Sequence, residues 1–204
     1  MEYVAHLSKD RKLKTLVESG EPHQLKKRKN TWIYLCASIM SQQLSTKVAD
    51  VIYKRFIALY GGKEPTPEQI LETPSETLRG IGLSNNKVSY IKNVAQFETD
   101  YGMDAKKLAK MTNEEIIEYL VVIKGVGRWT VEMLLMFTLG REDVFAVDDL
   151  GIQQGMISVF KLDAFDKKKL KARMLKLSQK WSPFRTYACL HLWRHKDGEN
   201  DPTS

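Results

Sequence analysis

Four stretches of this chain begin with a threonine or serine in a pattern that starts helices. Thr66-Pro67-Glu68-Gln69 and Thr112-Asn113-Glu114-Glu115 place Gln or Glu three residues after the threonine, which is the signature of a capping box. Thr73-Pro74-Ser75-Glu76 repeats the pattern, and Ser182-Pro183 is expected to open a helix that runs to Trp193. Strand signals hardly appear. The sequence therefore predicts an all-α fold.

Two connections between the expected helices are short. Segment 32–60 has apolar residues at helical spacing, but the polar residues from Ser41 to Ser45 interrupt it, so we expect two helices joined by a turn. Ile123-Lys124-Gly125-Val126-Gly127 separates a helix that begins near Asn113 from the apolar run 129–139. No low-complexity tract or flexible linker divides the chain, so residues 1–204 are expected to form a single unit whose lobes pack together.

Composition favours one kind of partner and excludes some kinds of site. The chain has 32 Lys and Arg against 25 Asp and Glu, and the net charge of +7 favours a polyanion. Its two cysteines, Cys36 and Cys189, are too few for a disulfide framework, an iron–sulfur cluster or a structural zinc site. No apolar stretch has the length of a membrane span, and the first residues lack the apolar core of a secretion signal. We expect a monomer without a membrane partner, in the cytoplasm with the nucleoid or in a nucleus.

The glycine-containing connection has the composition of a phosphate site. Glycine permits positive φ and close approach of a ligand, and the first amides of the following helix point outward at the positive end of its dipole. One DNA phosphate could therefore sit on the amides of Val126 and Gly127. Such a contact positions a duplex without reading its sequence. A lone Gly-x-Gly is equally typical of an ordinary helix connection.

Four motifs in order carry a resemblance to a known family. They are Ser41-Gln42-Gln43-Leu44-Ser45, then Gly125-Val126-Gly127-Arg128-Trp129-Thr130, then Val147-Asp148-Asp149, and finally 181–188. From about Trp32 to Trp193 the chain resembles the helix-hairpin-helix DNA glycosylase superfamily, and within it the short form of 3-methyladenine DNA glycosylase II. The resemblance implies a two-lobed helical bundle with its active site in the cleft between the lobes, and a hairpin and catalytic region at about 112–160.

The same resemblance implies a reaction. It is the hydrolysis of the N-glycosidic bond of alkylated purines, such as 3-methyladenine and 7-methylguanine, in damaged double-stranded DNA. The product is an abasic site, as in base excision repair.

The resemblance assigns the catalytic role to Asp149. Its local sequence is also typical of a helix N-cap, and the two roles are compatible because a helix N-terminus favours an ionised carboxylate. Such a carboxylate stabilises an oxocarbenium-like sugar. Asp148 is expected to cap or hydrogen-bond locally. Relatives that also cleave the strand carry a lysine where this chain has Trp129, and without that amine no Schiff base forms, so water attack is predicted.

Aromatic residues are expected to hold the damaged base. The resemblance places Trp129 and Trp193 in the base pocket, and Tyr53, Tyr187 and Met133 in the same cleft. An aromatic face attracts a cationic N-alkylated purine by about 0.5–2 kcal/mol per contact. Core packing is the alternative role for each of these side chains.

DNA contacts are expected at the two motifs that precede the catalytic aspartate. A flipped nucleotide leaves a gap in the duplex, and the resemblance makes Gln43, followed by Leu44, the side chain that fills it. Plain helix capping by Ser41 or Ser45 is the alternative. The hairpin residues expected to contact DNA are Lys124, Gly125, Val126, Gly127, Arg128 and Thr130.

Other functions remain open at this stage. The hairpin alone would suit a non-catalytic module that binds DNA structures, and a bifunctional glycosylase/lyase for oxidised bases shares the hairpin. A metal-dependent nuclease built on Asp148 and Asp149 lacks further ligands nearby. Relatives hold a monovalent cation, sodium or potassium, on hairpin carbonyls, which here belong to Val121, Ile123 and Val126. No other cofactor is expected.

Overall fold

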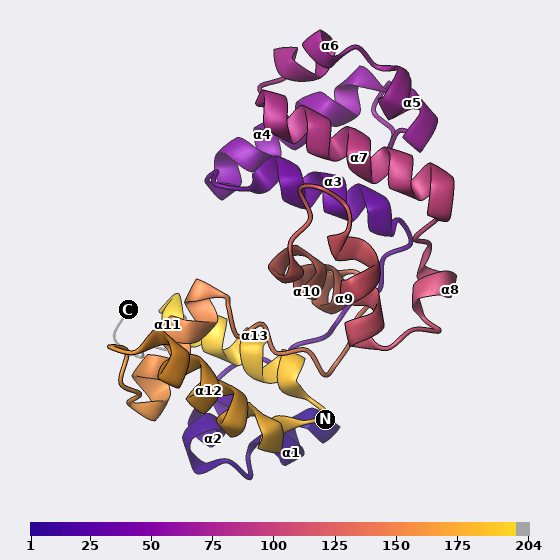
Figure 1. Ribbon diagram of the computed structural model, residues 1–204. Coiled ribbons are helices and arrows are strands. Elements are labelled where there is room, and N and C mark those ends of the chain that lie inside the picture. The colour runs from indigo at the N-terminus through magenta and orange to yellow at the C-terminus, as the bar shows by residue number, and fades with distance from the viewer. Residues whose placement is uncertain (199–204) are drawn as a thin grey trace. The chain divides into compact units, whose positions relative to one another are not determined.

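A computed structural model describes residues 1–198, in two compact units (Figure 1). Unit 2 is continuous and contains residues 27–134, whereas unit 1 combines residues 1–26 with the chain from Leu135 onward. Throughout residues 1–198 the regular elements are helices and none is a strand, so the prediction of an all-α fold is confirmed. No helix of the described residues is long and apolar enough to span a bilayer.

Unit 2 is built around α7, the longest helix of this unit. Against α7 pack α3, α5 and α6, and α3 also packs against α4. Their side chains form an apolar core that includes Leu35, Ile39, Phe56, Ile91 and Val94. The helices of this unit are α3 (Thr31–Ser41), α4 (Thr46–Leu59), α5 (Pro67–Glu72), α6 (Ser75–Gly80), α7 (Asn85–Tyr101), α8 (Ala105–Leu108) and α9 (Asn113–Val121). The next helix, α10 (Arg128–Phe137), begins in unit 2 and runs past its boundary.

Unit 1 joins the two ends of the described chain. Helix α13 packs against α11 and α2, and α2 contacts α1 and α11. Trp181 fills the centre of this unit, and its indole Nε1 donates to Asp10 Oδ2 at 2.8 Å. The elements are α1 (Glu2–Leu7), α2 (Arg11–Glu18), α11 (Leu150–Phe160), α12 (Lys167–Ser178), the 3₁₀ turn η1 (Gln179–Trp181) and α13 (Arg185–Lys196).

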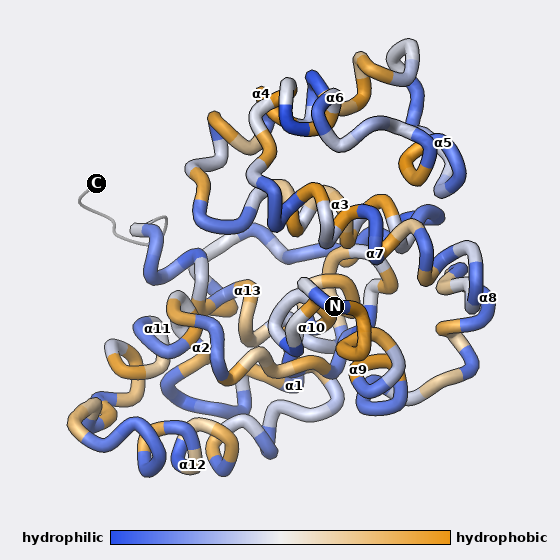
Figure 2. Tube along the Cα trace, turned by 45° about the horizontal axis from the view of Figure 1, so that its top comes forward, coloured by the Kyte–Doolittle hydropathy of each residue, from blue (hydrophilic) through white to orange (hydrophobic). Residues whose placement is uncertain are grey.

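Helix α12 shows how the charge of the chain is accommodated. Figure 2 shows this helix as blue interrupted by orange, which reflects lysines and arginine among apolar residues. Leu170 and Met174 are buried, whereas the lysines around them are exposed. Helical spacing therefore separates a narrow apolar face from a basic, solvated one.

Local capping signals predicted some helix starts correctly and others wrongly. Thr66 and Thr112 form complete capping boxes at α5 and α9, as expected. Thr73 does not cap α6, because its hydroxyl donates to the Gln69 carbonyl at the end of α5. The expected helix start at Ser182 is also wrong. The Ser182 hydroxyl instead donates to Asp143 at 2.8 Å, and α13 begins at Arg185.

Candidate active site

The glycine hairpin joins α9 to α10 through residues 122–127. Gly125 has φ +104°, and a Cβ atom there would lie 2.2 Å from the ring of Tyr90. Both the backbone conformation and the lack of space therefore require glycine at this position. Gly127 has no neighbouring atom within 4 Å of where its Cβ would be. Asn93 Nδ2 of α7 donates to the Lys124 carbonyl at 3.1 Å, which ties the turn to the core helix of unit 2.

Several backbone amides at the start of α10 have no backbone acceptor in the described chain. Within the described residues, the amides of Gly127, Arg128 and Thr130 donate to no other backbone group. The amide of Val126 is already used, since it donates to the Ile123 carbonyl at 2.9 Å. Outward amides at a helix N-terminus form an anion site. The amide of Gly127 and those after it, and not the amide of Val126, are therefore the donors that suit the predicted phosphate.

Three side chains predicted to contact DNA are engaged inside unit 2. Val126 and Thr130 are 5% and 3% exposed, so their side chains belong to the core. The guanidinium of Arg128 donates to both carboxylate oxygens of Glu114, at 2.7 and 2.8 Å, and to Glu132. These contacts raise the pKa of Arg128 and brace α9 against α10.

The turn between α3 and α4 matches the predicted turn around Ser41–Ser45. Gln43 lies at its apex with φ +57° and is exposed, as is Leu44. The ammonium of Lys87 on α7 donates to the carbonyls of Met40 and Gln42, at 2.9 and 2.8 Å. Ser45 caps α4, so the alternative role considered for this residue is present in the structure. The side chains of Gln43 and Leu44 are exposed to solvent.

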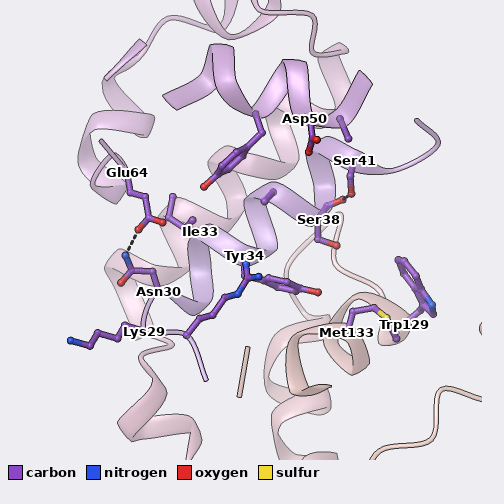
Figure 3. Close-up of a pocket in the computed structure, with 14 residues that line it drawn as sticks. Lys29, Asn30, Ile33, Tyr34, Ser38, Ser41, Asp50, Glu64, Trp129 and Met133 are labelled. Atoms are coloured by element: carbon purple, nitrogen blue, oxygen red, sulfur yellow. Dashed lines mark hydrogen bonds between the residues drawn. The ribbon is translucent and has the colours of Figure 1, made fainter. Parts of the chain in front are cut away.

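A pocket of about 710 Å³ opens within unit 2. Its walls include Trp129, Met133 and Tyr53, three of the five residues predicted to hold the base. Trp129 is 41% exposed, whereas Met133 is buried. In Figure 3, Trp129 and Met133 lie at one end of the pocket and Asn30 with Glu64 at the other. Burial raises the pKa of Tyr53, with Glu64 adding to the effect.

One face of α3 supplies pocket residues that the sequence reasoning missed. Tyr34 extends from this helix toward Ser38, Met133 and Trp129 (Figure 3). Its hydroxyl makes no hydrogen bond to the described residues, and burial raises its pKa to about 12. Helical spacing places these pocket residues on one face, but it does not show that the face lines a pocket. They are Tyr34, Ala37, Ser38 and Ser41 of α3, with its N-cap Asn30.

Asp149 is the N-cap of α11, as its local sequence predicted. Its Oδ1 accepts from the Ile152 amide at 2.8 Å and from the indole Nε1 of Trp193 at 2.7 Å. Both donors belong to unit 1. Two N–H groups on one oxygen stabilise the negative charge of the carboxylate and fix its orientation.

Asp148 is held in a different way. The ammonium of Lys171 on α12 donates to both of its carboxylate oxygens, at 2.8 and 2.7 Å. The pair is about half exposed. The two neighbouring aspartates thus have separate partners, and only Asp149 caps the helix.

Tyr187 lies in the core of unit 1. It is 8% exposed, its ring stacks on Tyr3 with centroids 3.9 Å apart, and its hydroxyl donates to Glu142 at 2.8 Å. Burial and the neighbouring Glu142 raise its pKa. The residue thus packs in the core of unit 1, and its contact with the base stays a prediction.

The part of the chain that the structure describes contains no cluster of metal-binding side chains. No group of three or more His, Cys, Asp or Glu side chains there is placed to hold a metal ion. Cys36 and Cys189 are both buried and neither forms a disulfide, and the Cys189 thiol donates to the Val144 carbonyl at 3.7 Å.

The fold and the site define a class of protein. A helix with a capping box joined by a glycine hairpin to a second helix, and then a helix capped by aspartate, make this an all-α protein of the helix-hairpin-helix type. Residues 36–182 match a family described as HhH-GPD superfamily base excision DNA repair protein. The chain belongs to this superfamily.

Individual relatives resemble the chain over most of its length. DNA-3-methyladenine glycosylase 1 of Schizosaccharomyces pombe is 38% identical over 186 residues, which is 90% of this chain and 80% of the relative. A crystal structure of DNA-3-methyladenine glycosidase from Bacillus halodurans has a TM-score of 0.86 at 35% identity, covering 99% of this chain and 92% of that one. The S. pombe 3-methyladenine DNA glycosylase Mag1, in complex with abasic DNA, has a TM-score of 0.82 at 33% identity, covering 98% of both chains.

Proposed function

We propose that this protein is a monofunctional DNA glycosylase that removes alkylated purines, such as 3-methyladenine and 7-methylguanine, from double-stranded DNA. The observation that carries the proposal is the carboxylate of Asp149, fixed at the N-terminus of α11 by the Ile152 amide and the indole of Trp193. Relatives named for 3-methyladenine removal, one of them bound to abasic DNA, support the substrate class.

The proposed reaction needs a carboxylate more than it needs an acid. An N-alkylated purine is cationic and leaves readily, so the barrier lies in the positive charge that develops on the sugar. Asp149 stabilises that charge, and water then attacks C1′ to leave an abasic site. Trp129 stands where lyase-competent relatives have a lysine, so no amine is present there to attack the sugar.

Binding to DNA is proposed to use the hairpin and the α3–α4 turn. The amides of Gly127 and Arg128 would hold one phosphate, and the exposed Lys124 adds positive charge beside them. Gln43, with Leu44 beside it, would enter the gap left by the flipped nucleotide. The protein would act as a monomer.

A monovalent cation is proposed at the hairpin. The carbonyls of Val121 and Val126 accept no backbone hydrogen bond in the described chain, and that of Ile123 accepts only one. These three oxygens fit the donor chemistry of sodium or potassium. A bound cation would add positive charge next to the phosphate site.

The experiment is a base-release assay on duplex DNA. Substrates carry 3-methyladenine, 7-methylguanine, ethenoadenine or hypoxanthine, and the wild type is expected to release the methylated purines. Asp149→Asn should abolish release while abasic DNA still binds. Asp148→Asn is the matched control, and because its ion pair with Lys171 is exposed, this variant should retain activity and lose at most about 1 kcal/mol of stability.

Other outcomes would redirect the proposal. DNA binding without base release would identify a non-catalytic binding module. A covalent complex trapped by borohydride would identify a lyase. Full activity of Asp149→Asn would remove the carboxylate from the mechanism.

A further inference from the structure

Helices α11 and α13 approach one another closely beside the catalytic carboxylate. Gly151 and Gly155 lie four residues apart on α11 and therefore on one face of it. A Cβ atom at Gly155 would be 2.9 Å from the Leu192 carbonyl, and one at Gly151 would be 2.8 Å from Cδ1 of Trp193. The glycines thus remove the side chains that would otherwise hold α13 away.

This close approach brings one side chain to Asp149. The indole Nε1 of Trp193 donates to Asp149 Oδ1 at 2.7 Å, and the same oxygen accepts from the Ile152 amide. The amide is fixed by the helix backbone, so the indole supplies the second direction that prevents the carboxylate from rotating. The ring of Phe137 contacts the Trp193 ring, with centroids 5.9 Å apart, and limits its movement.

We propose that Trp193 is a positioning residue whose indole N–H orients the carboxylate of Asp149, and that Gly151 is glycine because this contact requires the space. The proposal rests on the glycosylase function proposed above. It differs from the role of Trp193 as a stacking surface for the base, because the N–H acts on the carboxylate and so on the sugar.

Gly151 is the more selective probe of the two. A methyl group there would lie 3.0 Å from the indole Nε1 and 3.2 Å from Asp149 Oδ1, and would press into the hydrogen bond itself. Alanine is otherwise well tolerated in a helix. Gly151→Ala therefore displaces the donor without removing the tryptophan.

The test compares chemistry with binding. Single-turnover base release is measured on duplex DNA containing 7-methylguanine. Affinity is measured on the same duplex with a 2′-fluoro sugar, which resists cleavage because fluorine destabilises the oxocarbenium-like transition state. Trp193→Phe retains an aromatic ring but has no N–H. We expect its rate to fall roughly 10- to 100-fold, as for loss of one hydrogen bond to a charged group, with unchanged affinity.

The single-turnover rate of Gly151→Ala should fall by a similar factor. The rate of the double variant should fall no further than that of either single variant, because both substitutions break the same hydrogen bond between Trp193 and Asp149. Gly80→Ala is the matched control, since a Cβ at the end of α6 meets no atom within 4 Å. Its rate should equal that of the wild type. Thermal unfolding of each variant separates these effects from loss of the fold.

Each remaining outcome is decisive. If Trp193→Phe weakens binding of the fluorinated duplex and leaves the single-turnover rate intact, Trp193 stacks on the base and does not position Asp149. If both variants keep wild-type rates, the positioning role is wrong while the glycosylase function stands. If the wild type itself releases no base, the proposed function fails.

Discussion

Gly125 and Gly127 stand two residues apart in the hairpin but have different surroundings. Alanine at position 125 would adopt a strained positive φ and would meet the ring of Tyr90, so Gly125→Ala should cost about 2–4 kcal/mol of unfolding free energy. Alanine at position 127 meets nothing, but its methyl group would stand where a phosphate approaches. Gly127→Ala should therefore weaken DNA binding with little change in stability.

Denaturant unfolding and binding to abasic duplex DNA measure the two effects separately. The expected pattern is a stability loss for one glycine and an affinity loss for the other. Equal stability of the two variants would contradict the steric argument at Gly125. Unchanged affinity of Gly127→Ala would remove that glycine from the phosphate site.

Single residues also show where sequence reasoning stops. The N-cap role of Asp149 was predictable because the whole interaction lies within a few residues of sequence, and its catalytic role stays a prediction. Val126, Thr130 and Tyr187 are predicted to contact DNA or base and are all buried, which the motifs did not reveal because a motif fixes a position in the chain but not the direction of the side chain. Arg128 is predicted to contact DNA, but its guanidinium binds Glu114. The sequence did not show this ion pair, because Glu114 lies 14 residues away and comes close only when α9 and α10 fold together.

At the scale of helices, α7 supports the turn that is proposed to fill the DNA gap. Lys87 donates to two carbonyls at the end of α3, and burial lowers its pKa. Lys87→Met should free the turn that carries Gln43, since both carbonyls lose their partner. We expect base release from duplex DNA to fall about 5- to 10-fold, equivalent to a hydrogen bond of about 1 kcal/mol.

Lys92 provides the matched control on the same helix. Its ammonium donates to the Leu71 carbonyl at the end of α5, a similar bond far along the chain from the α3–α4 turn. Lys92→Met should lower the melting temperature by a comparable amount and leave base release intact. If both variants lose activity equally, the effect reflects stability and not the turn.

Helix starts were predictable only where the cap bonds within its own helix. Thr66 and Thr112 each bond to the amide three residues ahead, so the short pattern contained the whole interaction. Thr73 has the same pattern, but its hydroxyl donates to the Gln69 carbonyl at the end of α5. The sequence does not show which of these two hydrogen bonds a threonine at this position makes. Tyr34 was missed because its place in a pocket depends on how α3 packs in unit 2, which involves residues distant in sequence.

At the scale of the whole molecule, unit 1 depends on contacts between the two ends of the chain. His191 on α13 is fully buried, and its ring lies 4.6 Å from that of His23, which follows α2. Burial, followed by the charges of His23 and Arg194, lowers the pKa of His191 from 6.5 to about 4. Between these values the unfolded chain binds the extra proton and the folded chain does not.

Stability should therefore decrease as the pH falls from about 6.5 toward 4, and be fully present above 6.5. For His191 alone, the shift corresponds to about 2 kcal/mol lost at pH 5 relative to pH 7. His191→Gln removes this titration, so its unfolding free energy, measured by urea denaturation across this range, should vary less with pH than that of the wild type. A lower stability at every pH with the wild-type slope would mean that His191 contributes packing alone, and that another group makes unit 1 sensitive to acid.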